Sequence, residues 1–82
     1  MRFRLPEHAR KRMSERLVSE AMVASALENS TKIEKDSRGR LLIKMLYTRR
    51  KKERLLLLAA EWEGETLCII TIIDTTKISK YL

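Results

Sequence analysis

Residues 54–74 read RLLLLAAEWEGETLCIITIID, two apolar runs separated by the turn Glu63-Gly64-Glu65. Short apolar runs rich in branched residues and joined by a glycine-containing turn are typical of the two strands of a β-hairpin. We therefore expect strands at 54–62 and 66–74 that pair antiparallel. This hairpin is the centre of the expected sheet, and the rest of the chain is interpreted around it.

Both faces of this hairpin are apolar. In the first strand Leu56, Leu58 and Ala60 point one way and Leu55, Leu57 and Ala59 the other. In the second strand Leu67, Ile69 and Ile73 oppose Cys68, Ile70 and Ile72. Two short helices cover only one face of such a sheet, so the second face needs other cover. We expect a homodimer or a dedicated protein partner there. The alternative is that residues 77–82 fold back over it.

The N-terminal third of the chain predicts two helices. Pro6 suits the first turn of a helix over 6–16, and Leu5, Ala9, Met13 and Leu17 form its apolar stripe. Ser19 is a suitable N-cap for a second helix that ends near residue 28.

From Thr31 the apolar spacing changes to two. We expect strands at 31–35 and 40–48, a basic loop at 49–52, and an N-terminal edge strand within residues 1–5. The prediction is one α+β domain over 1–82, in the order β-α-α-β-β-β-β, with the two N-terminal helices on one face of a mostly antiparallel sheet of four to five strands.

Composition narrows the function classes. Eighty-two residues exclude a multidomain enzyme, and the net charge of +7 favours an acidic partner. A single cysteine, no apolar leader and no long apolar run predict a cytoplasmic protein with no membrane contact. Glutamine is absent and asparagine occurs once, a bias associated with hyperthermophiles.

The charge is segregated along the chain. Residues 1–16 and 49–54 each carry +4, and 77–82 carry +2, whereas 55–76 carry four acidic residues and no basic one. A converging basic surface is what phosphate backbones select, because each neutralised phosphate releases counterions. The alternative is that these charges only keep the protein in solution. The residues expected to bind nucleic acid are Arg10, Lys11, Arg49, Arg50, Lys51, Lys52, Arg54, Lys77 and Lys80.

No metal or nucleotide motif is present. One histidine and one cysteine give no metal-ligand spacing, and both glycines lie in expected turns, so we expect no metal and no cofactor. RNA cleavage without a metal needs a proton acceptor, a proton donor and cations around the phosphate. The residues that could supply these groups are His8, Arg12, Arg16 and Tyr81, with Tyr47 as an alternative hydroxyl donor. The alternative for His8 is a hydrogen bond to backbone or to a nearby carboxylate.

The first helix also carries a resemblance. His8-Ala9-Arg10-Lys11-Arg12-Met13-Ser14-Glu15-Arg16, with Val18-Ser19-Glu20 after it, resembles a group of small uncharacterised prokaryotic proteins that open with His-Ala-x-x-Arg-Met-x-x-Arg. Leu17 departs from that group, in which glycine is common between the helices.

By topology the group is similar to the RelE/ParE/BrnT toxins, small basic proteins that act on messenger RNA or other targets and are neutralised by an antitoxin. The resemblance implies binding to RNA, with or without ribosomes, and an antitoxin-like protein partner. It leaves open whether the chain is an enzyme. The activity would be a metal-independent endoribonuclease, and the alternative is a non-catalytic, homodimeric nucleic-acid- or protein-binding module.

Overall fold

The computed structural model describes residues 2–82 and confirms the α+β fold in the expected order. The elements are β1 (Phe3–Arg4), α1 (Glu7–Arg16), α2 (Glu20–Glu28), β2 (Lys32–Lys35), β3 (Leu41–Arg49), β4 (Lys52–Glu63), β5 (Thr66–Thr75) and α3 (Ile78–Tyr81). The five strands form one sheet in the order β1-β5-β4-β3-β2, and only the β1–β5 pair is parallel. Met1, part of the expected edge strand, lies outside the described residues.

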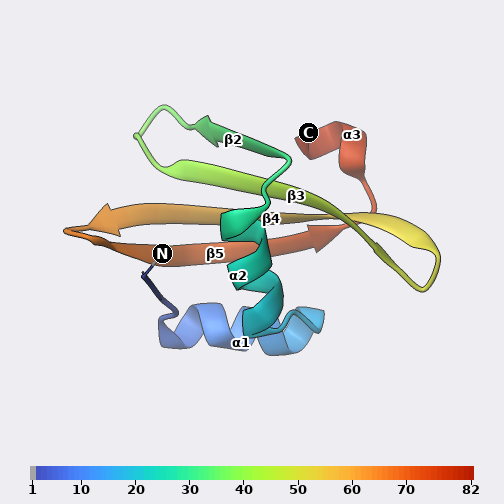
Figure 1. The fold of residues 1–82 in the computed structure, drawn as a ribbon, viewed down its shortest axis with the longest axis horizontal. Helices are drawn as coiled ribbons and strands as arrows, with labels where there is room; N and C mark the ends of the chain where they lie inside the picture. Colours follow the sequence, from blue (N-terminus) through green and yellow to red (C-terminus); the bar gives the residue numbers. More distant parts are fainter. Residues whose placement is uncertain (1) are drawn as a thin grey trace.

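Helices α1 and α2 lie on one face of the sheet (Figure 1), α1 against β5 and α2 against β3. The core between them contains Ala9, Val23 and Ala26 from the helices and Leu58 and Ile69 from the sheet, all fully buried. Ser19 caps α2 as expected, because its Oγ accepts a hydrogen bond from the backbone N–H of Met22 at 3.2 Å. No helix within residues 2–82 is long and apolar enough to cross a membrane.

Leu17 was wrongly placed in the apolar stripe of the first helix, because its side chain is 73% exposed. Its backbone takes the left-handed conformation, with φ 57°, and ends α1. The N–H of Val18 donates to the carbonyl of Met13 and that of Leu17 to the carbonyl of Ser14, the pattern of a Schellman motif. Leucine therefore occupies a position that usually holds glycine.

A β-bulge changes the faces of β5. Ala59 pairs with Thr71 and Ala60 with Ile69, so Ile70 has no partner of its own on β4. An extra residue reverses the alternation that follows it, because successive side chains point to opposite faces. Ile72, and not Ile73 as expected, therefore joins Ile69 in the core under the helices.

The second face of the sheet is largely closed within a single chain. Leu55, Leu57, Ala59 and Cys68 are buried although they lie outside the core under α1 and α2. Lys32 pairs with Lys44, and Lys44 pairs with Leu57, so all three side chains lie on this second face. The Nζ of Lys32 donates to the carbonyl of Leu82 at 3.1 Å. The C-terminal segment with α3 thus lies on this side, which was the alternative to association.

Lys44 is buried on this second face of the sheet, and its Nζ donates to Oε1 of Glu34. This hydrogen bond is the main cause of a lowered pKa of Glu34, with Lys32 contributing. A carboxyl group whose folded pKa lies below its unfolded value stabilises the fold above that unfolded value and loses this contribution as the pH falls.

We expect the free energy of unfolding to fall as the pH drops from neutral to below about 4.3, the usual pKa of a glutamate carboxyl, and the slope to be smaller in Glu34→Gln. The variant also leaves Lys44 unpaired, so it should be less stable than the wild type at pH 7. Urea unfolding across this range is the measurement, with the exposed Glu28→Gln as the matched control. Equal slopes in wild type and Glu34→Gln would contradict the prediction. Asp36 contributes to the slope in both proteins, because hydrogen bonds from the backbone of Arg40 and Arg38 lower its pKa.

Candidate nucleic-acid interface

A basic pocket of about 490 Å³ opens between the C-terminal end of α1 and the β3–β4 hairpin. Five basic and two acidic residues line it, which gives its wall a formal net charge of +3. The lining residues are Glu15, Arg16, Leu17, Arg49, Arg50, Lys52, Arg54 and Asp74. We call this the arginine pocket.

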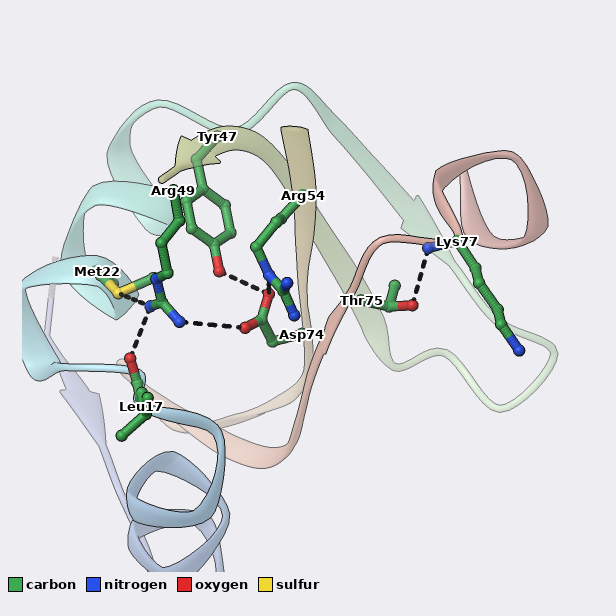
Figure 2. A network of polar contacts seen from close by, with 8 residues as sticks. All are labelled: Leu17, Met22, Tyr47, Arg49, Arg54, Asp74, Thr75 and Lys77. Carbon is green, nitrogen blue, oxygen red and sulfur yellow. Dashed lines mark hydrogen bonds and ion pairs between the residues drawn. The ribbon is translucent and has the colours of Figure 1, made fainter. Parts of the chain in front are cut away.

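The side chain of Asp74 is only 3% exposed and organises the floor of the arginine pocket (Figure 2). Its Oδ1 accepts hydrogen bonds from the hydroxyl of Tyr47 at 2.6 Å and from Nε of Arg54 at 3.1 Å. Its Oδ2 forms an ion pair with Arg49 at 3.6 Å. One buried carboxylate thus holds two guanidinium groups and a phenol.

Strand register explains why these four side chains meet. Tyr47 pairs with Arg54 across β3 and β4, and Asp74 on β5 pairs with Leu56, two residues beyond Arg54. Residues separated by two on a strand share a face, and cross-strand partners lie on the same face. Tyr47, Arg49, Arg54 and Asp74 therefore all face the side of the sheet that carries α1 and α2.

The side chain of Arg49 connects the turn between α1 and α2 to strand β3. Its guanidinium donates to the carbonyl of Leu17 at 2.7 Å and contacts Sδ of Met22 at 3.5 Å (Figure 2). It also lies 5.6 Å from the ring centroid of Tyr47, within the range of a cation–π contact. Arg49 is therefore mainly a structural cation, whereas Arg54 contacts Asp74 through its Nε.

The electrostatics of the pocket favour anion binding over proton transfer. Hydrogen bonding to Asp74 raises the pKa of Arg54, which keeps it charged. Burial, and then the bond to Asp74, raises the pKa of Tyr47, so its hydroxyl stays protonated at neutral pH and is no general base. Asp74 contacts only two of the five cations, Arg49 and Arg54, and its single negative charge offsets only one positive charge. Arg16, Arg50 and Lys52 remain at the pocket for an external anion, Arg16 with a weak 4.0 Å pairing to Glu15.

A protein-family model matches residues 5–81, nearly the whole chain, and its description is "Domain of unknown function (DUF4258)". The chain belongs to this family. The prediction of an uncharacterised family is thereby confirmed. No curated protein and no solved structure is significantly similar to this DUF4258 chain.

The structure of this DUF4258 chain places His8 away from the arginine pocket. His8 and Arg16 lie at opposite ends of α1, about 12 Å apart along the helix axis. Nε2 of His8 contacts the carbonyl oxygen of Ile70 at 2.5 Å, and because a carbonyl only accepts, Nε2 carries the proton. Ile70 is the bulge residue, so His8 satisfies a backbone group left out of the strand ladder. This contact is the backbone alternative considered for His8.

The other expected site residues are dispersed. Arg12 pairs with Glu15 at 3.5 Å, and Arg10 with Glu20 at 2.7 Å. His8, Arg10 and Lys11 line a second, more open hollow together with Glu7. Tyr81 and Lys80 lie on α3, where they contact each other, and Lys77 immediately precedes that helix. Of the four expected catalytic residues, only Arg16 lines the arginine pocket.

The basic segment at 49–52 differs from the expected loop. Arg49 and Lys52 belong to β3 and β4 and pair with each other, so the turn consists of Arg50 and Lys51 alone. Asp74, which organises the pocket, was not among the expected site residues. Its signal was present, since Asp74 is the one charged residue between Thr66 and Thr75.

Proposed function

We propose that this chain is a toxin-type protein similar to the RelE/ParE/BrnT group, and that it acts in the cytoplasm by binding RNA in the arginine pocket. The observation that carries the proposal is the pocket wall of charge +3, in which a buried carboxylate orients two arginines and leaves the other cations to the ligand. Oriented guanidinium groups match the oxygens of a phosphodiester, and cations fixed before binding lose little entropy on binding.

The geometry supports RNA binding more directly than RNA cleavage. Cleavage through the 2′-hydroxyl needs a base and an acid beside the phosphate. In the arginine pocket the Tyr47 hydroxyl already donates to Asp74, and His8 lies at the other end of α1. The bond between His8 and Ile70 therefore favours the second candidate, a non-catalytic binding module that pairs as a homodimer.

Removing two pocket cations that do not contact Asp74 should weaken RNA binding. We expect Arg16→Gln with Lys52→Gln to lower the affinity for RNA about tenfold at 0.1 M salt, and to reduce the slope of log K against log salt by about 2. Fluorescence anisotropy at several salt concentrations measures both quantities.

The matched control is Lys35→Gln with Arg38→Gln, which also removes two positive charges. Both residues are exposed and lie about 26 Å away near the opposite end of β3, where Lys35 pairs with Leu41. This control should change the affinity less than threefold. Equal effects of the two double variants would overturn the assignment of the pocket, and salt-independent binding would overturn the electrostatic basis of the proposal.

Incubation of RNA with the protein, with and without ribosomes, separates the two candidates. Cleavage that disappears in His8→Ala and Arg12→Ala would support an endoribonuclease. Binding without cleavage would support the non-catalytic module. An antitoxin-like partner is part of the toxin proposal only.

A further inference from the structure

The turn between β3 and β4 is built from residues that disfavour its backbone conformation. Arg50 and Lys51 have φ values of 52° and 65°, and Arg49 pairs with Lys52 directly across the hairpin. A two-residue hairpin turn with positive φ at both positions is of type I′, which strongly prefers Asn-Gly. The turns at 36–39 and 63–65 place glycine, Gly39 and Gly64, at their positive-φ positions.

Charge adds to this backbone strain. Four consecutive cations, Arg49 to Lys52, lie at one hairpin tip, and like charges directly opposite each other destabilise a strand pair. Leu17, the third non-glycine residue with positive φ among residues 2–82, lines the same pocket as Arg50. Strained backbone that gathers at one place is typical of a functional site.

We propose that the Arg50-Lys51 turn is a docking element for double-helical RNA, which lies across the mouth of the major groove and contacts phosphates of both strands. This inference rests on the proposed function and assigns its substrate class. The arginine pocket binds the phosphate backbone of one RNA strand, and the hairpin tip extends the contact to the other RNA strand. Figure 1 shows the β3–β4 turn projecting beyond the helices at one end of the longest axis of the molecule.

The residues at the tip favour a duplex over a single strand. Proteins that bind single strands combine cations with aromatic rings on which the bases stack. No aromatic residue lies between Thr48 and Glu53. The ring of Tyr47 lies beneath Arg49 and its hydroxyl is held by Asp74, while the exposed Trp62 lies about 33 Å away along β4.

The shape of the tip fits the same substrate. The two strands of the ribbon lie about 4.8 Å apart, so the ribbon with its side chains is too wide to enter the deep, narrow major groove of an A-form helix. The basic end of the ribbon can instead lie across the mouth of that groove, where the phosphates of both strands come close together. A tip that carries only cations uses those phosphates and needs no base contacts.

The test replaces the turn by its preferred sequence, Arg50→Asn with Lys51→Gly. We expect a melting temperature several degrees above the wild type, because both positions lose strain. We expect the affinity for a 20-base-pair RNA duplex to fall about tenfold and that for a 20-nucleotide unstructured RNA to fall less than threefold. The Lys35→Gln, Arg38→Gln protein is again the charge-matched control, and should leave the preference for duplex unchanged.

Three results would overturn the inference: an equal loss for both RNA forms in the turn variant, a wild type that binds the single strand as tightly as the duplex, or equal binding to a B-form DNA duplex. In each of these cases a loss of binding in Arg16→Gln, Lys52→Gln would leave the proposed RNA function intact. If no RNA binds in a salt-dependent way, the proposed function and this inference both fail. A lower melting temperature in the turn variant would refute the strained turn on which the inference rests.

Discussion

Replacing Asp74 by asparagine is expected to lower the free energy of unfolding by about 3 kcal/mol and the melting temperature by more than about 10 °C. Removing one partner from a buried ion pair leaves the other charge uncompensated. Here the single carboxylate serves both Arg49 and Arg54, whose side chains are 28% and 27% exposed. Because water still reaches the arginines in part, we expect the lower end of the range for buried pairs.

The same substitution should weaken RNA binding although it makes the protein more basic. Charge alone predicts tighter binding to phosphate in Asp74→Asn. Positioning predicts the reverse, because the amide has no negative charge and only one acceptor oxygen, which cannot hold Tyr47, Arg54 and Arg49 together as the carboxylate does. Glu53→Gln is the matched control, since Glu53 is exposed beside the basic tip and its loss also adds one positive charge. It should tighten binding slightly.

Urea unfolding and RNA anisotropy on these two variants decide the matter, with binding measured at a temperature at which both proteins are folded. A tighter RNA complex in Asp74→Asn would show that Asp74 only dilutes the charge of the pocket. An unfolding free energy within about 1 kcal/mol of the wild type would show that the arginines do not depend on it.

The order of helices and strands could be predicted because each depends on local signals. Pro6, the Ser19 cap and the two-residue alternation after Thr31 mark the elements without any tertiary information. The bulge at Ile70 could not be predicted, since nothing in a run of isoleucines marks which residue leaves the ladder. The exposure of Leu17 could not be predicted for a related reason. A leucine at helical spacing resembles a core residue, and its left-handed backbone depends on the following turn.

The site could be predicted only in its charge. Arg16, Arg49, Arg50, Lys52 and Arg54 were expected to bind nucleic acid or phosphate, and the structure brings them together in one pocket. Their organisation by Asp74 depends on strand register, which composition does not determine. His8 was a catalytic candidate because it is the single histidine, but the ability of imidazole to transfer protons does not show where the side chain lies. Its contact with the carbonyl of Ile70 depends on the β-bulge, which could not be predicted from the sequence.

Adjacent leucines on the central strand should differ in what they contribute to stability. Leu58 is fully buried under α1 and α2, and Leu58→Ala should cost about 3 to 4 kcal/mol, a large share of the roughly 5 to 15 kcal/mol typical of a domain. Leu57 is 6% exposed and lies on the opposite face, outside that core. We expect Leu57→Ala to cost about 2 kcal/mol, because fewer elements surround the cavity it leaves and they can close over it.

Repeating both unfolding measurements over a hundredfold range of protein concentration tests what covers the second face. If a single chain closes it, with α3 on that side, the midpoints of wild type and both variants stay constant. In a homodimer that pairs through this face, the wild-type midpoint rises with concentration, and Leu57→Ala reduces that rise while Leu58→Ala does not. A sedimentation mass of two chains would accompany the second result and support the homodimeric module. A constant midpoint with a one-chain mass would exclude the homodimer. The half-buried Leu46 and Ile73 would then lie on the surface of a monomer.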